Sequence, residues 1–193
     1  MTNENIQLVL ASGSPRRREL LALTGIPFMI DAPEVDEQTD LGAKEAVQEL
    51  SRRKGLAGAA LHPGKVILAA DTLVAMDNVP LGKPTDEADA FKMLRSLSGR
   101  WHQVYTGVCA VSADGQVYQG LDASDVRFGE MTDDEIRAYI ATGEPMDKAG
   151  AYALQGGAGL WIEEVRGTPS GVIGLPMPLT RKLLAQCGLN VMK

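Results

Sequence analysis

The sequence contains little histidine and cysteine, with two of each among 193 residues. Cys109 and Cys187 lie far apart, and with only His62 and His102 besides them we expect no structural zinc site. No apolar stretch reaches the roughly 20 residues that a membrane-spanning helix needs. No basic segment precedes the short apolar run near the N-terminus, as it would in a signal peptide. We therefore expect a cytoplasmic protein without a membrane partner.

Positive charge is also scarce. The chain has 19 Lys and Arg against 25 Asp and Glu, a formal net charge of −6 at pH 7. A general nucleic-acid-binding protein carries a basic excess, so we expect no nucleic-acid partner. A polyanionic substrate is repelled by such a chain on average, and a site that binds one has to gather its cations locally.

Three familiar motifs are missing. The sequence has no G-x-x-x-x-G-K-[ST] loop, no G-x-G-x-x-G after a predicted strand and no G-x-S-x-G elbow. These absences argue against a P-loop nucleotidase, a dinucleotide-binding unit and a serine hydrolase.

Apolar periodicity predicts strands and helices mixed along the chain, which indicates an α/β or α+β fold. Ser14 and Pro15 are typical of a helix start, and Thr132 with Glu135 predicts a capping box. No repeat or linker is visible, so we expect residues 1–193 to form one unit. The predicted strands span 6–12, 28–30, 66–76, 104–112, 116–128, 161–165 and 172–173, and further helices span 43–61, 86–98, 132–143 and 178–187.

Arg16, Arg17 and Arg18 occupy the first turn of the first predicted helix. A cation there is disfavoured by roughly 0.3–1 kcal/mol, because a helix N-terminus carries partial positive charge. The same helix end offers backbone N–H groups that bind phosphate well. The arginines form either an anion site, in which guanidinium and N–H groups converge on phosphate oxygens, or a solvated basic patch.

Asp71 interrupts an apolar run, residues 66–76, that is typical of a strand covered on both faces. An ionised carboxylate in such a strand is costly unless it is paired, hydrogen-bonded or bound to metal. Asp71 is therefore either a metal ligand or general base, or the cap of a turn at a strand end. Lys54 lies on the apolar side of its predicted helix, where it either points into a cleft or extends to solvent from the edge.

Two lysines and an acidic cluster lie in predicted loops. Lysines such as Lys83 and Lys148, next to glycine and proline, are usually plain surface charge. The cluster of Glu34, Asp36 and Glu37 gains interest only together with Asp71, because Mg²⁺ takes one or two carboxylates plus substrate phosphates as ligands. Otherwise it is a solvated loop.

Four segments together resemble the Maf family, in an order and spacing that match it from about Leu8 to the last predicted helix. Any one of them is a weak signal, whereas the four together are specific. They are residues 11–18 (ASGSPRRR), 70–72 (ADT) with 82–84 (GKP), 97–100 (LSGR) with 105–107 (YTG), and 147–152 (DKAGAY) with 155–156 (QG).

The resemblance implies a two-lobed α/β fold like that of the inosine-triphosphate pyrophosphatases, with a mixed twisted sheet, helices on both sides and the active site in the cleft. It implies a pyrophosphatase that attacks the α–β phosphoanhydride, with Asp71 as proton acceptor. Arg16, Thr72 and Gln155 match positions that the family links to substrate choice. The further residues that match the lining of the family's cleft are Ser12, Arg17, Glu37, Lys54, Lys83 and Lys148.

Segments 12–17 and 71–72 and the late Gln155 resemble the branch that acts on dTTP and UTP, with modified pyrimidine nucleotides as further candidates. The branch acting on 7-methyl-GTP resembles Ser-Thr-Ser-Pro and Asp-Gln at these places, and this chain has neither. Residues 167–171 depart from the family, which usually has an aromatic residue and an Asn there. The family also implies a homodimer.

A mechanism follows from both the residues and the resemblance. The cations surround the triphosphate, and Mg²⁺ or Mn²⁺ is held by Glu37, Asp71 or both. Asp71 positions or deprotonates the water, while Thr72 and Gln155 hydrogen-bond the base. Two other functions remain open: a pyrophosphatase that removes other non-standard nucleotides, and a non-enzymatic regulator of septum formation and cell division.

Overall fold

A mixed seven-stranded sheet runs through the part of the chain that the computed structural model describes, residues 7–192. Its order is β2-β1-β3-β5-β6-β7, and β4 pairs with β3. The pairs of β1 with β2 and β3 are parallel, and all other pairs are antiparallel. The strands are β1 (Leu8–Leu10), β2 (Phe28–Ile30), β3 (Val66–Met76), β4 (Val79–Leu81), β5 (Trp101–Val111), β6 (Val117–Phe128) and β7 (Ile162–Arg166).

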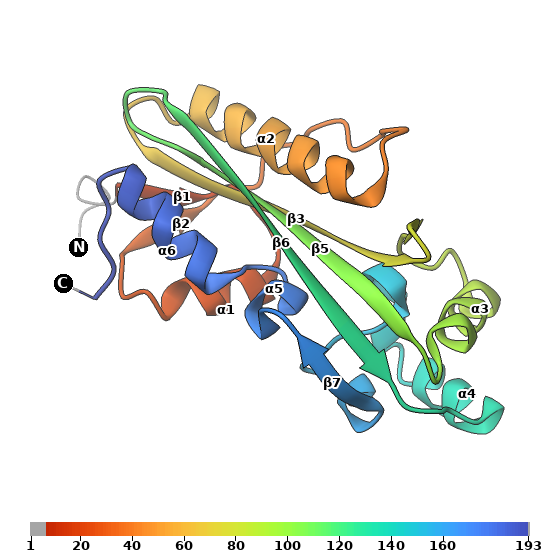
Figure 1. The fold of residues 1–193 in the computed structure, drawn as a ribbon. Helices are drawn as coiled ribbons and strands as arrows, with labels where there is room; N and C mark the ends of the chain where they lie inside the picture. Colours follow the sequence, from red (N-terminus) through yellow and green to blue (C-terminus); the bar gives the residue numbers. More distant parts are fainter. Residues whose placement is uncertain (1–6, 193) are drawn as a thin grey trace.

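Helices cover both faces of this sheet (Figure 1). One face carries α2, which lies along β3 and β5, and the other carries α6 and α5. At the far end of the long β5–β6 hairpin, α3 packs against α4. This arrangement confirms the predicted α/β class with a mixed sheet and helices on both sides. The helices are α1 (Pro15–Ala22), α2 (Ala43–Leu61), α3 (Glu87–Leu97), α4 (Asp133–Ala141), α5 (Pro169–Ile173) and α6 (Met177–Gln186), with short 3-10 turns η2 (Glu144–Asp147), η3 (Ala149–Ala151) and η4 (Gly157–Leu160).

The contact between α2 and the sheet is unusually close because it is made by glycines. A Cβ atom on Gly107 of β5 would lie 2.2 Å from the carbonyl oxygen of Val47. A Cβ on Gly55 would lie 2.8 Å from Cys109 Sγ. Because such distances are far below van der Waals contact, the absence of side chains at these glycines lets the backbone of α2 rest directly on the sheet.

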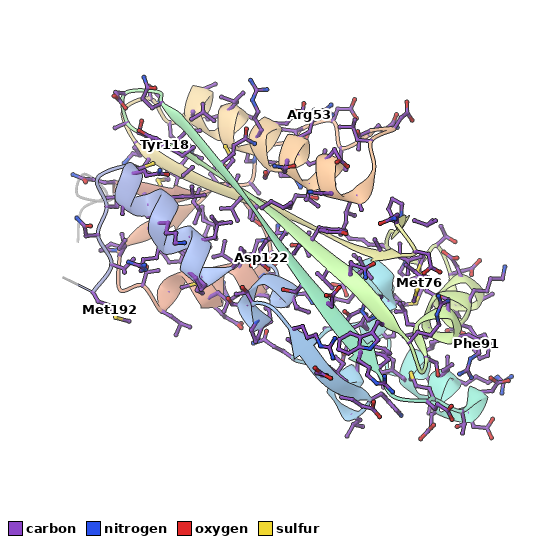
Figure 2. All side chains as sticks on the ribbon, in the orientation of Figure 1. Arg53, Met76, Phe91, Tyr118, Asp122 and Met192 are labelled. Carbon is purple, nitrogen blue, oxygen red and sulfur yellow. The ribbon has the colours of Figure 1, made fainter. Side chains whose placement is uncertain are left out.

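Strand β3 passes from one hydrophobic core into another. Before Asp71, its residues pack in cores shared with β1, α1 and α6, whereas Val74 and Met76 belong to a core shared with α3 and α4. In Figure 2, Met76 and Phe91 mark the second core and Tyr118 lies toward the opposite end of the hairpin. Asp71 therefore lies where two packed lobes meet, as the expected two-lobed fold requires.

Most predicted elements are present, and two differ. The predicted strand 172–173 is wrong, because these residues end the short helix α5, which starts at Pro169. Strand β4 was not predicted. It follows a turn in which Asp77 and Asn78 both have positive φ, 50° and 65°, the backbone that a tight hairpin turn requires. The observed β1 begins at Leu8, and residue 6 of the predicted strand lies outside the described residues.

Candidate active site

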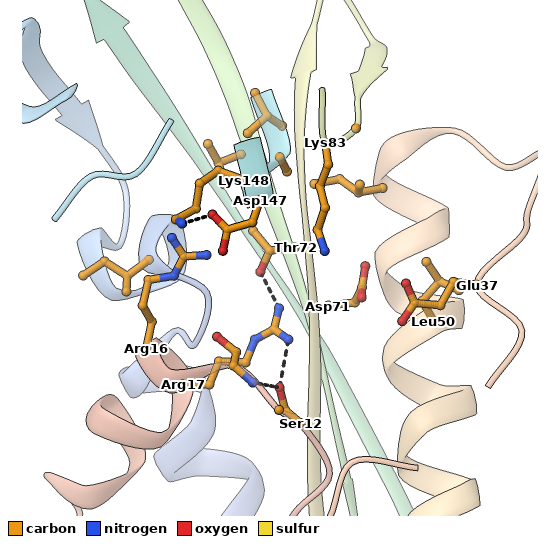
Figure 3. Close-up of a pocket in the computed structure, with 18 of the residues that line it drawn as sticks. Ser12, Arg16, Arg17, Glu37, Leu50, Asp71, Thr72, Lys83, Asp147 and Lys148 are labelled. Atoms are coloured by element: carbon orange, nitrogen blue, oxygen red, sulfur yellow. Dashed lines mark hydrogen bonds and ion pairs between the residues drawn. The ribbon is translucent and has the colours of Figure 1, made fainter. Parts of the chain in front are cut away.

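A cavity of about 790 Å³ lies at Asp71, where these cores meet. Figure 3 shows Arg16 and Lys148 on one side of this cavity, Glu37 and Leu50 on the opposite side, and Asp71 between them. The structure thus brings together, in one cavity, residues from β3, α1, α2 and the loops that contain residues 12, 37, 83 and 148–155. All the predicted site residues line it: Ser12, Arg16, Arg17, Glu37, Lys54, Asp71, Thr72, Lys83, Lys148 and Gln155.

Asp71 is buried in the middle of β3, with 8% of its surface exposed, and does not cap a turn. Its Oδ1 accepts a hydrogen bond from Nζ of Lys54 at 2.6 Å. Lys54 reaches it from α2 and also pairs with Glu37 Oε1 at 2.7 Å. The position of Lys54 on the apolar side of its helix is thereby explained, because its ammonium compensates the charge of a buried carboxylate.

Arg17 links three parts of the chain. Its Nε donates to the carbonyl oxygen of Gly174 at 2.8 Å, Nη1 to Ser12 Oγ at 3.2 Å and Nη2 to Thr72 Oγ1 at 3.1 Å. Burial lowers the pKa of Arg17 below its usual value, while the nearby Asp71 acts in the opposite direction. A guanidinium has five N–H groups, so two remain for a ligand.

The three arginines at the start of α1 therefore have different surroundings. Arg17 holds the wall of the cavity together, Arg16 faces the cavity (Figure 3), and Arg18 is exposed. Ser14 is the N-cap residue, as predicted, but its side chain does not cap the helix.

The remaining cations come from two loops that touch. The backbone N–H of Gly150 donates to the carbonyl oxygen of Gly82 at 3.0 Å, which joins the loop of Lys83 to that of Lys148. Nζ of Lys148 is hydrogen-bonded to Asp147, and this bond lowers the pKa of the Asp147 carboxyl group. Asp147 also lines the cavity; it stands in the segment 147–152 that resembles the family, but no role was predicted for it.

Hydrogen bonds to residues outside the cavity hold the segment that carries Gln155. Both carboxylate oxygens of Glu144 accept from the N–H of Gly157, at 3.1 and 3.0 Å, and Tyr139 Oη donates to Glu144 at 2.7 Å. Tyr152, which lines the cavity, is hydrogen-bonded to the buried His102 at 2.7 Å. His102 and Tyr152 are 50 residues apart, and no sequence pattern links them.

The carboxylates suit a hard divalent cation that is bound mainly by substrate. Among residues 7–192 no group of three or more His, Cys, Asp and Glu side chains is arranged to hold a metal ion. Glu37 and Asp71, however, each place one oxygen within 2.7 Å of the Lys54 ammonium, so the two carboxylates lie close together on this side of the cavity. Because Mg²⁺ is commonly bound by one or two carboxylates plus phosphate oxygens, this pair fits such an ion.

Comparison with known proteins agrees with this picture. Residues 7–187 match the family described as "Maf-like protein". The chain belongs to the Maf family. Among its relatives, a dTTP/UTP pyrophosphatase of Symbiobacterium thermophilum is 47% identical over 188 residues, which cover 96% of each chain. A dTTP/UTP pyrophosphatase of Deinococcus radiodurans is 42% identical, over 95% of this chain and 94% of its own.

Two solved structures resemble this Maf-family chain more distantly. A nucleoside-triphosphatase, also called dITP/XTP pyrophosphatase, of Mycobacterium abscessus is 17% identical, with a TM-score of 0.44 over 63% of this chain and 73% of its own. The Ham1 protein of Staphylococcus aureus is 16% identical, with a TM-score of 0.46 over 63% and 71%. No helix within residues 7–192 has both the length and the apolarity that a membrane crossing requires.

Proposed function

We propose that this Maf-family chain is a nucleoside triphosphate pyrophosphatase that converts dTTP and UTP to the monophosphate and pyrophosphate. Membership of the family and the names of relatives 41–47% identical to the chain support this proposal. The structural observation that carries it is the placing of Asp71 among cations from different walls of one cavity: Lys54 from α2 is paired with it, Arg16 and Lys148 lie on the opposite side, and Lys83 points toward it.

The cations act first by binding the triphosphate. The chain is acidic overall, with a net charge of −6, so the attraction has to be local. Lys83 points toward Asp71 in Figure 3, while Arg16 and Lys148 come from the opposite wall to Glu37. In this arrangement they neutralise phosphate oxygens and hold the α-phosphorus in front of Asp71.

Asp71 then serves as the proton acceptor. Its Oδ1 is occupied by the Lys54 ammonium, so Oδ2 receives the proton of the attacking water. The water oxygen forms a bond to the α-phosphorus as the bond to the α–β bridging oxygen breaks, and pyrophosphate leaves with that oxygen. Lys54 orients the carboxylate and compensates its charge before the proton arrives.

Glu37 and Asp71 are the residues that would hold a divalent cation, Mg²⁺ or Mn²⁺. When bound, the ion supplies further neutralisation of phosphate charge. Thr72 and Gln155, which also line the cavity, are proposed to contact the base. Polar groups that pair with one base reject another strongly, because mismatched groups are left buried and unpaired.

A panel of nucleoside triphosphates tests the function. We expect equal amounts of monophosphate and pyrophosphate, with the highest kcat/KM for dTTP and UTP. Release of orthophosphate would place cleavage at another bond and contradict the proposal. A preference for other non-standard nucleotides would favour the pool-cleaning alternative, and no turnover of any nucleotide would favour the non-enzymatic one.

A further inference from the structure

A chain of hydrogen bonds runs from the cavity into the protein through two threonines. Thr72 Oγ1 lines the cavity and lies 2.9 Å from Thr106 Oγ1 on the neighbouring strand β5. Thr106 Oγ1 donates to the carbonyl oxygen of Gly171 in α5 at 2.8 Å. On the cavity side, Arg17 Nη2 donates to Thr72 Oγ1 at 3.1 Å.

The direction of every hydrogen bond in this chain is determined. A hydroxyl group has one hydrogen, and a carbonyl oxygen can only accept. Thr106 therefore gives its only hydrogen to Gly171, and the bond between the two threonines has to be donated by Thr72. Since Arg17 uses one acceptor position of Thr72 Oγ1, the hydroxyl of Thr72 offers a ligand one acceptor position and no hydrogen.

Tight packing holds both ends of this series of hydrogen bonds in place. Thr106 is fully buried and lies directly opposite Thr72 in the β3–β5 pairing. Gly171 is packed so tightly that a Cβ on it would lie 2.2 Å from Asp122 Oδ2. Gly171, whose carbonyl fixes the direction of the hydrogen bonds, is therefore tightly packed, directly before Val172 and Ile173, which line the cavity.

We propose that Thr106 is a positioning residue that sets base specificity by making Thr72 a pure acceptor. The inference rests on the proposed function, in which Thr72 contacts the base. Uracil and thymine carry a hydrogen on N3 and can donate to Thr72, whereas N3 of cytosine has none and is itself an acceptor. A cytosine N3 placed against Thr72 would face an acceptor, with both groups left unpaired.

Substitution of Thr106 tests this inference through the ratio of kcat/KM for UTP to that for CTP. Thr106→Val keeps the shape but removes the acceptor of the Thr72 hydrogen, so Thr72 can rotate and donate to cytosine. We expect the ratio to fall about tenfold, the value of roughly one hydrogen bond. Thr106→Ser keeps the hydroxyl and should keep the ratio.

Thr180 provides the matched control. It is also fully buried, and its hydroxyl has no hydrogen-bond partner among the described residues. Thr180→Val should therefore leave the ratio unchanged. The thermal midpoint of each variant shows that it is folded, and a neutron structure of the wild-type protein should show the Thr72 deuteron directed at Thr106.

Several results would overturn the inference. A folded Thr106→Val variant with the wild-type ratio would do so, as would an equal change in Thr106→Ser or a Thr72 deuteron that points into the cavity. Equal wild-type hydrolysis of UTP and CTP would overturn it while leaving the pyrophosphatase function intact. If the wild-type protein releases pyrophosphate from no nucleotide, the proposed function fails and this inference fails with it.

Discussion

The ammonium of Lys54 lies 2.6 Å from a carboxylate oxygen of Asp71, although one residue comes from a helix and the other from the middle of a strand. Both side chains are largely withdrawn from water, with 13% and 11% of their surfaces exposed. The removal of one partner from such a pair is strongly destabilising, whereas the pair itself adds little net stability. The pair therefore links the stability of the fold to the chemistry of the cavity.

The first prediction concerns the stability of this pair. Lys54→Met leaves a buried carboxylate without a counter-charge, and we expect the free energy of unfolding to fall by about 3–5 kcal/mol. The double variant Lys54→Met/Asp71→Asn has no unpaired charge there and should be the more stable of the two. Urea unfolding at pH 7, followed by circular dichroism, measures both. A double variant no more stable than Lys54→Met would contradict the expectation.

The second prediction concerns turnover. Asp71→Asn keeps the shape of the side chain but removes the proton acceptor, so we expect kcat to fall by about 10²–10⁴ while the protein stays folded. Asp77→Asn is the control, because Asp77 is an exposed carboxylate at the β3–β4 turn, paired with Arg100 outside the cavity. Pyrophosphate release from dTTP measures the effect. Near-normal activity of Asp71→Asn would remove this residue from the mechanism.

The third prediction concerns the metal ion. We expect EDTA to abolish pyrophosphate release and Mg²⁺ or Mn²⁺ to restore it. Glu37→Gln should raise the metal concentration needed for half-maximal activity, because one of the two nearby carboxylates loses its charge. Glu34→Gln, an exposed position in the same loop that does not line the cavity, should have no such effect. Full turnover in chelator would eliminate the metal from the reaction.

The fourth prediction concerns the loop that carries Glu37. Arg53 projects from α2 (Figure 2), and its Nη1 donates to the carbonyl oxygens of Asp36 and Gln38, each at 3.1 Å, on either side of Glu37. Arg53→Ala should raise hydrogen exchange in residues 36–41 roughly three- to tenfold, because two hydrogen bonds are lost. The exposed neighbour Arg52 gives the control, Arg52→Ala. Equal exchange in both variants would show that Arg53 does not hold the loop.

The fifth prediction concerns acid stability. Burial lowers the pKa of His102 from 6.5 to about 4, against a smaller opposing effect of Asp125. The folded state therefore binds this proton less readily than the unfolded state, and the stability from neutral His102 is present above pH 6.5 and lost as the pH falls toward 4. The loss amounts to about 3 kcal/mol.

His102→Gln removes this titration. Its free energy of unfolding should therefore change less with pH between 6.5 and 4 than that of the wild-type protein, whatever its absolute stability. Urea titrations at several pH values provide the comparison. Parallel curves for the two proteins would show that the buried imidazole makes no such contribution.

The sequence predicted best the elements whose burial is continuous or strictly periodic. The bounds of α2 and β3 agree with the predicted ranges, because one has a long apolar side and the other is covered on both faces. Short elements were harder to predict. Two apolar residues, Val172 and Ile173, fit a strand as well as a helix, and Pro169 at the first helical position decides for the helix. Strand β4 contains Pro80, which weakens its strand pattern.

The site was predictable where a residue looked unfavourable for stability alone. Asp71 in an apolar strand and Lys54 on an apolar helix side were recognised for this reason, and the structure pairs them. Thr106 and Arg53 were not recognised, because their effect depends on strand pairing and on a loop 15 to 17 residues away. A threonine in a strand and an arginine on a helix are ordinary residues until their partners are known.

The backbone contact between Gly107 of β5 and Val47 of α2 limits which parts of the molecule can move. With the carbonyl of Val47 pressed against a residue that lacks a side chain, α2 has no space to slide toward the sheet. Helix α2, which carries the Lys54 ammonium, is thus a wall of the cavity with a fixed position. Adjustment to an entering nucleotide is therefore expected in the irregular segment 31–42, which contains no strand and no helix.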